Sequence, residues 1–122
     1  MLFRSTGIPV VTCWDSIDLI ETDNIYFAGR GGIMGDRAGN FAVQNSDLII
    51  AIGNRLNIYQ VGYQADSWAR EAFVVDIDID AMELQKKTIH VDLLKMFYCF
   101  LYFILCNIMY NLKFCPAIII CN

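Results

Sequence analysis

Glycine and arginine residues in two short stretches have the types and spacing of ligand-contacting loops. Five of the eight glycines lie in residues 29–39, and a Gly-x-Arg turn follows at residues 53–55. So many glycines exclude a continuous helix or strand, because glycine loses the most conformational freedom on folding. The glycine-rich stretch is therefore a loop that serves either tight turns or close approach to a nucleotide. Arg55 follows an apolar run, which favours a ligand contact, whereas Arg37 has an acidic neighbour and could equally form a weak surface ion pair.

Three carboxylates, Asp76, Asp78 and Asp80, alternate along the chain and would lie on one face of an extended segment. Such a face could hold a divalent cation, since carboxylate oxygens are its preferred ligands. Asp80 is better explained as a helix cap, and Asp76 as a residue at a solvated strand end. The five cysteines include no CxxC pair, and His90 is the only histidine. We therefore predict no metal site in this chain.

Charge and apolar residues are distributed unevenly along the 122 residues. The formal net charge is -4 and Lys and Arg are not clustered, so we expect no nucleic-acid partner. All 13 acidic residues precede Leu93, whereas residues 93–122 are mostly apolar and contain four of the five cysteines. The odd cysteine number and the lack of a secretory signal predict reduced thiols and a cytoplasmic protein. The break in composition divides the chain into residues 1–92 and a tail, residues 93–122.

Short apolar runs alternate with helix-forming segments in residues 1–92. Continuous apolar or β-branched runs predict buried parallel strands at residues 8–13 and 48–52, the second covered on both faces. Further strands are expected at residues 73–79, where the apolar residues alternate towards the end, and at residues 89–91. Short helices are expected after the glycine-rich loop at residues 40–45, at residues 66–72 and at residues 80–84. Strands separated by helices predict an α/β fold with a parallel sheet and right-handed crossovers.

These elements carry three motifs in a fixed order: PVVT at residues 9–12, GDRAGNFAVQNSDLIIAIGNRL at residues 35–56 and VDIDIDAMEL at residues 75–84. Together they resemble the central domain of thiamine-diphosphate-dependent enzymes, in the acetolactate-synthase-like branch. The resemblance covers residues 7–92 and implies a Rossmann-like parallel sheet with flanking helices. It also implies that the parent protein uses thiamine diphosphate and magnesium.

Relatives in this branch hold FAD along the carboxyl ends of the central-domain strands, as is usual for open parallel sheets. The resemblance places three groups beside such a ligand: the glycine-rich loop, the Gly-x-Arg turn, and the strand end that meets the adenosine part. They are Ile33, Met34, Gly35 and Arg37, then Gly53 and Arg55, then Asp78 and Ile79. Loop amides would face phosphate or ribose oxygens, and a carboxylate suits ribose hydroxyls. Two departures are a shortened segment between Gly35 and Asn40 and the absence of a Gly-Asp pair after the last strand.

The resemblance places the catalytic parts of the family outside this chain. A glutamate from an N-terminal domain and a magnesium-bound diphosphate in a C-terminal domain carry the chemistry, and no Gly-Asp-Gly motif with a following Asn pair is present. We expect no catalytic residue here and no activity of this chain alone. The family domain also opens with a strand and helix upstream of the GIPVVT sequence. Only six residues precede Gly7, so we expect one internal strand of the sheet to be missing.

The tail, residues 93–122, differs from the rest of the chain in its long apolar run. Residues 96–106 are 11 consecutive apolar residues, and the stretch between Lys95 and Lys113 falls just short of the ~20 residues that span a bilayer. We expect the tail to be helical and unrelated to the family pattern. Its residues have A/T-rich codons, which favours translation of non-coding sequence as its origin. A membrane anchor through residues 96–112 is the alternative.

The sequence thus predicts a fragment of a thiamine-diphosphate-dependent carboligase or decarboxylase that acts on 2-oxo acids. Its central domain would be a scaffold, with FAD or another nucleotide as a candidate ligand, in a cytoplasmic homo-oligomer. The alternative is a non-catalytic nucleotide-binding or interaction module, membrane-associated through the tail.

Overall fold

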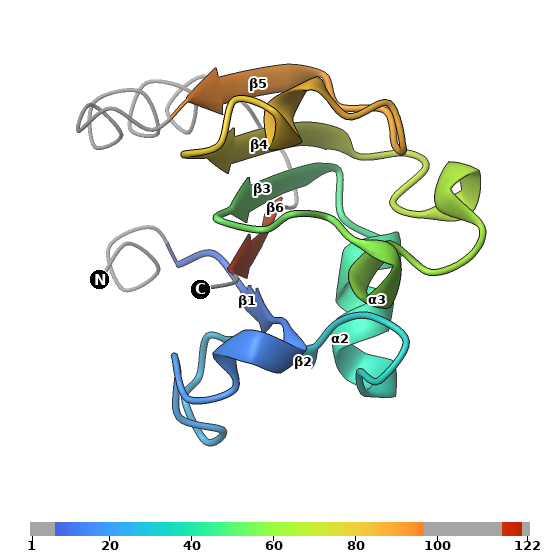
Figure 1. Cartoon of the computed structure of the whole chain (residues 1–122). Helices are drawn as coiled ribbons and strands as arrows, with labels where there is room; N and C mark the ends of the chain where they lie inside the picture. Colours follow the sequence, from blue (N-terminus) through green and yellow to red (C-terminus); the bar gives the residue numbers. More distant parts are fainter. Residues whose placement is uncertain (1–6, 97–115, 121–122) are drawn as a thin grey trace.

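The computed structural model describes residues 7–96 and 116–120 of the chain. These residues form one sheet of six parallel strands in the order β2-β1-β6-β3-β4-β5 (Figure 1). The strands are β1 (Val10–Thr12), β2 (Phe27–Arg30), β3 (Leu48–Ile52), β4 (Phe73–Asp78), β5 (Leu93–Met96) and β6 (Pro116–Ile120). The predicted α/β fold with a Rossmann-like parallel sheet is confirmed.

The helices are short. They are α2 (Arg37–Gln44), α3 (Ile58–Val61) and the 3-10 helices η1 (Trp14–Ser16), η2 (Ala65–Ser67) and η3 (Glu83–Gln85). The two α-helices each follow a side chain that caps them, Asp36 for α2 and Asn57 for α3. α2 begins before the expected residue 40 because the Asp36 carboxylate caps it, accepting from the Gly39 amide at 2.7 Å. The helix expected at residues 66–72 is reduced to the single 3-10 turn η2.

Strand β2 was missed because its sequence, FAGR, lacks a β-branched residue and runs into the glycine-rich loop. The strand lies at the edge of the sheet, paired with β1. Gly29 lets α2 approach it closely: a Cβ at that position would lie 2.6 Å from the Gly39 amide nitrogen. The backbone of β2 and not its side chains therefore faces the helix at this point.

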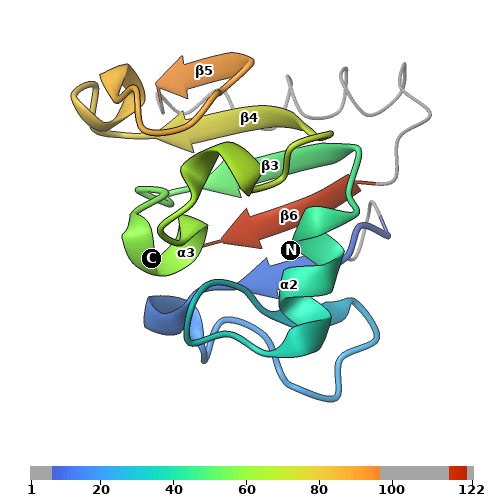
Figure 2. The same ribbon diagram turned by 90° about the vertical axis from the view of Figure 1, so that its right-hand side faces the viewer.

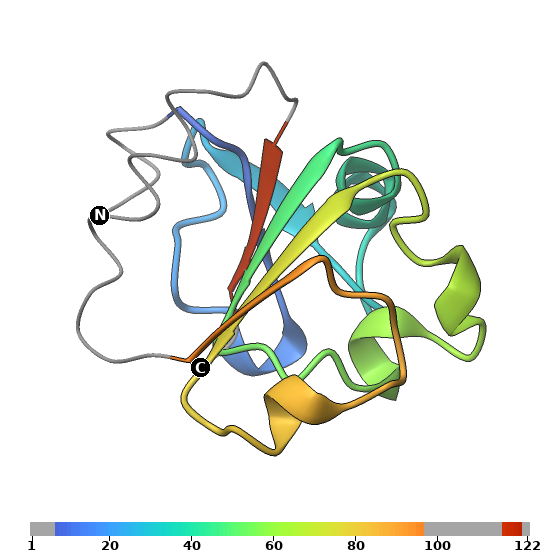
Figure 3. The same ribbon diagram turned by 90° about the horizontal axis from the view of Figure 1, so that it is seen from above.

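The strands are buried on both faces, as the continuous apolar run of residues 48–52 predicted for β3. On one face a cluster that includes Val11, Ile49 and Val74 packs against Val43 of α2. On the other face Leu48, Ile50, Val75 and Ile77 pack with Ile8. α2 and α3 both lie on the first of these faces (Figure 3).

The strand expected at residues 89–91 lies a few residues later, at β5 (Leu93–Met96), so the sheet continues past Asp92. Asp92 precedes the strand and fixes it to Val74: its amide donates to the Val74 carbonyl at 3.0 Å, and its carboxylate accepts from the Val74 amide at 2.8 Å. Ile89 and Val91 pack against the core instead of joining the ladder. A side-chain acceptor thus sets where the strand begins.

Strand β6 comes from the tail and occupies the middle of the sheet, between β1 and β3 (Figure 2). The prediction that the tail, residues 93–122, is helical is therefore wrong for residues 93–96, which form β5, and for residues 116–120, which pair as a strand on both sides. The internal position that we expected to be empty is filled. Residues 97–115 and 121–122, including most of the candidate anchor at 96–112, lie outside the described residues. Among the described residues, no helix has the length and apolar character needed to cross a bilayer.

Candidate functional site

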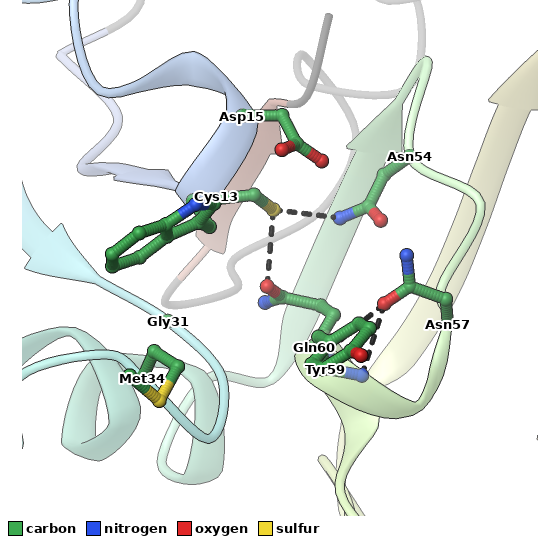
Figure 4. A pocket seen from close by; sticks show the side chains of 9 residues that line it. Cys13, Asp15, Gly31, Met34, Asn54, Asn57, Tyr59 and Gln60 are labelled. Carbon is green, nitrogen blue, oxygen red and sulfur yellow. Dashed lines mark hydrogen bonds between the residues drawn. The ribbon is translucent and has the colours of Figure 1, made fainter.

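A crevice of about 510 Å³ opens at the carboxyl ends of the strands, above β1, β2 and β3 (Figure 4). The chain steps from β1 to β2 in one direction and from β3 through β4 to β5 in the other. Open parallel sheets bind ligands at such a reversal of strand order. The lining residues follow these strands or belong to α3: Cys13, Trp14, Asp15, Gly31, Met34, Asn54, Asn57, Tyr59 and Gln60.

The floor of the crevice is made of buried neutral polar groups that bond to one another. Asn54, only 2% exposed, donates from Nδ2 to the Cys13 Sγ at 3.2 Å and accepts from the Leu56 amide at Oδ1, at 2.9 Å. The Gln60 side-chain amide lies against the same sulfur, with Oε1 at 3.0 Å. These contacts connect the ends of β1 and β3 with α3 and hold the floor in one arrangement.

Cys13 takes part in a disulfide bond, which corrects the expectation that the thiols are reduced. A disulfide sulfur has no proton to donate, so it can only accept hydrogen bonds. The Gln60 Nε2 has no hydrogen-bond partner among the described residues. Exchanging the two ends of this amide would bring Nε2 to the sulfur, so that a donor faces an acceptor.

The rim of the crevice is apolar and exposed. Trp14, Met34 and Tyr59 line the crevice and expose more than half of their surface to solvent. Flat aromatic faces above buried amides suit a planar heteroaromatic ring, which can stack on the rim and bond to the floor. Asn57 supports this rim because its Oδ1 caps α3, accepting from the Tyr59 amide at 3.0 Å.

The glycine-rich loop is held against α3 by its own backbone. The Ile33 amide donates to the Tyr59 carbonyl at 2.7 Å, and the Gly32 amide donates to the Asn40 Oδ1 at 2.8 Å. The Gly35 amide donates to the Gly32 carbonyl at 3.0 Å. Gly32 has φ +97, and a Cβ there would lie 2.3 Å from the Tyr59 carbonyl oxygen. These three loop amides are therefore engaged within the protein, and Gly32 serves a turn and a close backbone approach.

The eight site residues expected from the sequence fall into two groups along the carboxyl edge of the sheet. Ile33, Met34, Gly35 and Arg37 belong to the loop and the first turn of α2, and of the eight only Met34 lines the crevice. Gly53, Arg55, Asp78 and Ile79 lie at the ends of β3 and β4. Their order in the strands brings Gly53 beside Asp78, since the Gly53 amide donates to the Ile77 carbonyl at 2.8 Å.

The strand-end group is only partly accessible. Asp78 is buried, and its Oδ1 accepts from the Asp80 amide at 2.8 Å, whereas Ile79 and Arg55 are exposed. Asp80 in turn accepts from the Met82 amide at 2.9 Å, as expected of a cap. Arg55 lines a second, much smaller hollow with Asp76, Glu83 and Lys86.

Asp76 is not the solvated residue that the sequence suggested. It is 5% exposed, and its Oδ1 has no hydrogen-bond partner among the described residues. Burial, and then the neighbouring Asp78 carboxylate, raise the pKa of Asp76 to about 6. Asp76 is enclosed because β5 extends the sheet beyond β4 and because Leu84 of η3 and Ile89 lie around the same hollow. In the described part of the chain, no three Asp, Glu, His or Cys residues lie close enough to hold a metal ion.

Sequence reasoning missed most of the crevice, including Cys13, Trp14, Asn54, Asn57 and Gln60. The positions of Cys13 and Asn54 were available as a signal, because Cys13 ends one predicted strand and Asn54 follows another by two residues. Side chains at the carboxyl ends of parallel strands converge on one edge. The contribution of α3 carried no such signal, because its four residues lie in a segment that looked like a polar loop.

The sequence of this chain matches a known protein family. A family profile described as "Thiamine pyrophosphate enzyme, central domain" matches residues 1–98. The chain belongs to this family. The resemblance expected from the three motifs is thereby confirmed.

Several relatives of this thiamine pyrophosphate enzyme domain are acetolactate synthases. The chain is 36% identical over 82 residues to "Acetolactate synthase isozyme 2 large subunit" of Escherichia coli, covering 67% of this chain and 15% of the relative. It is 39% identical over 91 residues to an acetolactate synthase of Mycobacterium bovis, covering 75% of this chain and 14% of the relative. A rice protein described as "Probable acetolactate synthase 2, chloroplastic" is 36% identical over 89 residues, which are 72% of this chain and 13% of the relative. The chain thus matches about one seventh of the length of these relatives.

Proposed function

We propose that this chain serves as the central scaffold of a thiamine-diphosphate-dependent carboligase or decarboxylase that acts on 2-oxo acids. The observation that carries the proposal is the family match together with the identity to acetolactate synthases. Thiamine diphosphate and its magnesium, when bound, would supply the carbon–carbon bond chemistry. The residues of this chain would position neighbouring domains in a cytoplasmic homo-oligomer and would not contact the reacting atoms.

Domain replacement tests the scaffold role. Residues 7–96 of this chain would replace the matching segment of the Escherichia coli relative, and the chimera would be assayed for formation of acetolactate. The core variant Val11→Asp, placed in the same chimera, is the control for a scaffold that does not fold, because Val11 is fully buried. A folded chimera without activity would count against the proposal, and in favour of a free-standing nucleotide-binding module.

The crevice is proposed as a site for a flavin nucleotide, with FAD as the candidate. Its volume lies within the roughly 300–1,000 Å³ of small-molecule sites, and its aromatic rim above buried amides suits a planar ring. The exposed Arg37 and Arg55 guanidinium groups could bond phosphates, which the engaged loop amides could not. Asp78 and Ile79, beside Gly53, would face the ribose and base at the β4 end. Met34 would contact the ligand from the opposite wall, and Ile33 and Gly35 would hold Met34 in place from the loop beside the crevice.

Flavin titration tests this site. Adding the full chain to FAD should quench flavin fluorescence saturably, because the ring stacks on the rim. Tyr59→Ala should weaken binding by about three- to tenfold, the size expected for one aromatic stack. Tyr63→Ala is the matched control, since Tyr63 is 86% exposed and does not line the crevice. Absence of saturable quenching, or equal loss in both variants, would contradict the flavin proposal.

A further inference from the structure

Strand β6 joins two otherwise separate parts of the sheet. On one side it pairs with β1, Val10 opposite Ile118 and Thr12 opposite Ile120. On the other side it pairs with all five residues of β3, from Leu48 opposite Pro116 onward. No pairing between β1 and β3 occurs in the described part of the chain. The β2-β1 pair and the β3-β4-β5 unit are therefore hydrogen-bonded to each other only through residues 116–120.

The two strands that flank β6 are among the most buried segments of the protein. Val10, Val11 and Thr12 of β1 are fully buried, as are Ile49 and Ala51 of β3. Without a strand between them, both would present unpaired backbone groups in a buried setting, which is costly because those groups would lose water without gaining a partner. The position between β1 and β3 thus requires a strand.

The sequence of residues 116–120, Pro-Ala-Ile-Ile-Ile, fits that requirement. Three consecutive β-branched residues favour an extended backbone and are typical of central parallel strands. Proline has no amide proton, and it stands at the first residue of the strand, where a sheet tolerates it. Nothing in this segment is charged, so it can enter a buried position at little desolvation cost.

We propose that the gap between β1 and β3 is a strand-binding site, filled by the chain's own residues 116–120 and able to accept the same segment from a second copy. β6 is the last of the described strands in sequence yet lies centrally in the sheet, so the segment that fills the gap is distant in sequence from both strands that flank it. A strand end can be supplied by a neighbouring molecule with the same parallel register, as in strand exchange between identical chains. The recognised ligand is a short, uncharged, β-branched segment aligned parallel to β1 and β3.

The test disables the strand in cis and supplies it in trans. Ile118→Pro in the full chain removes a ladder donor at the residue that lies opposite both Val10 and Ile50. We expect its melting temperature to fall by at least about 10 °C, whereas the control Ile118→Val should stay close to the wild type. A peptide of residues 113–122 with serine for both cysteines should then restore the melting temperature of Ile118→Pro saturably. The same peptide carrying the proline should not.

Each remaining outcome overturns the proposal. An Ile118→Pro chain as stable as the wild type would show that the segment is not needed between β1 and β3. A destabilised chain that the peptide does not restore would show that the gap does not accept a strand in trans. If Ile118→Pro does not fold alone, it is refolded with the peptide; failure to recover a folded one-to-one complex again contradicts the proposal. None of these results depends on flavin binding or carboligase activity.

Discussion

Buried polar groups are paired in one region near the carboxyl edge of this sheet and incompletely paired in another. Above β1 and β3, Asn54 and Gln60 are neutral amides whose contacts with the Cys13 sulfur form a connected floor. Within β4, two residues before its carboxyl end, Asp76 is a buried carboxylate with an oxygen that has no partner among the described residues. In the first region the polar groups are held in place by one another, as in a preformed binding site. The second loses stability whenever its carboxylate is charged.

The largest change in stability that follows from this contrast is expected from Asp76→Asn. The pKa of Asp76 in the folded protein, about 6, lies above the roughly 3.9 of an unfolded aspartate, so the folded state binds the proton more tightly. Stability from this group is present below about pH 4 and is lost as the pH rises through about 6. Asp76→Asn should therefore raise the free energy of unfolding at pH 7 by up to about 3 kcal/mol and flatten its pH dependence.

Urea unfolding at several pH values between 4 and 8 would measure this effect. Asp66→Asn is the matched control because Asp66 is exposed. If the difference in unfolding free energy between wild type and Asp76→Asn is the same at every pH, burial does not raise the pKa of Asp76. The crevice floor and the Asp76 region would then not differ in this way.

A smaller effect, of opposite sign, is expected at the crevice floor: Asn54→Ala should lower the free energy of unfolding. The change removes the donor to the Cys13 sulfur and the acceptor of the buried Leu56 amide, which is then left without a side-chain partner. We expect a loss of about 2 kcal/mol in unfolding free energy, independent of pH over the range in which Asp76 titrates. Asn45→Ala, at an exposed position, should cost less than a quarter of that. Equal losses in the two variants would mean that the crevice floor contributes no special stability.

The smallest effect is expected from Asp36, whose carboxylate can be compared directly with that of Asp76. Both oxygens of Asp36 are used, accepting from the Arg30 amide at 2.9 Å and the Gly39 amide at 2.7 Å, whereas Asp76 has an oxygen without such a partner. Asp36→Ala should therefore destabilise by about 1 kcal/mol, opposite in sign to Asp76→Asn. Thermal unfolding beside the exposed-loop control Asp23→Ala would measure it. A stabilising Asp36→Ala would contradict the role of its carboxylate as a helix cap.

Sequence alone predicted the strands whose residues are apolar on both faces, because such runs have few alternatives to a central parallel strand. β3 has the predicted bounds, and β4 differs by one residue. β2 and β5 were missed or displaced because their positions depend on Gly29 and Asp92, which act through contacts with distant residues. The place of residues 116–120 in the sheet could not be predicted either, since it depends on a gap that forms only when β1 and β3 come together.

The candidate site shows the same division. The carboxyl edge of the sheet was predicted because a parallel sheet has only one such edge. Which side chains line the crevice depends on α3, whose four residues are fixed by the Asn57 cap and not by apolar periodicity. The buried state of Asp76 was missed for a related reason: the alternating acidic pattern does not show which strand covers it.

The domain exchange with the Escherichia coli relative tests the scaffold role most directly. If residues 7–96 form a central domain of this family, the chimera should make acetolactate, and the same chimera with Val11→Asp should not. A chimera that is folded, by circular dichroism and cooperative melting, but no more active than the Val11→Asp form would contradict the scaffold role.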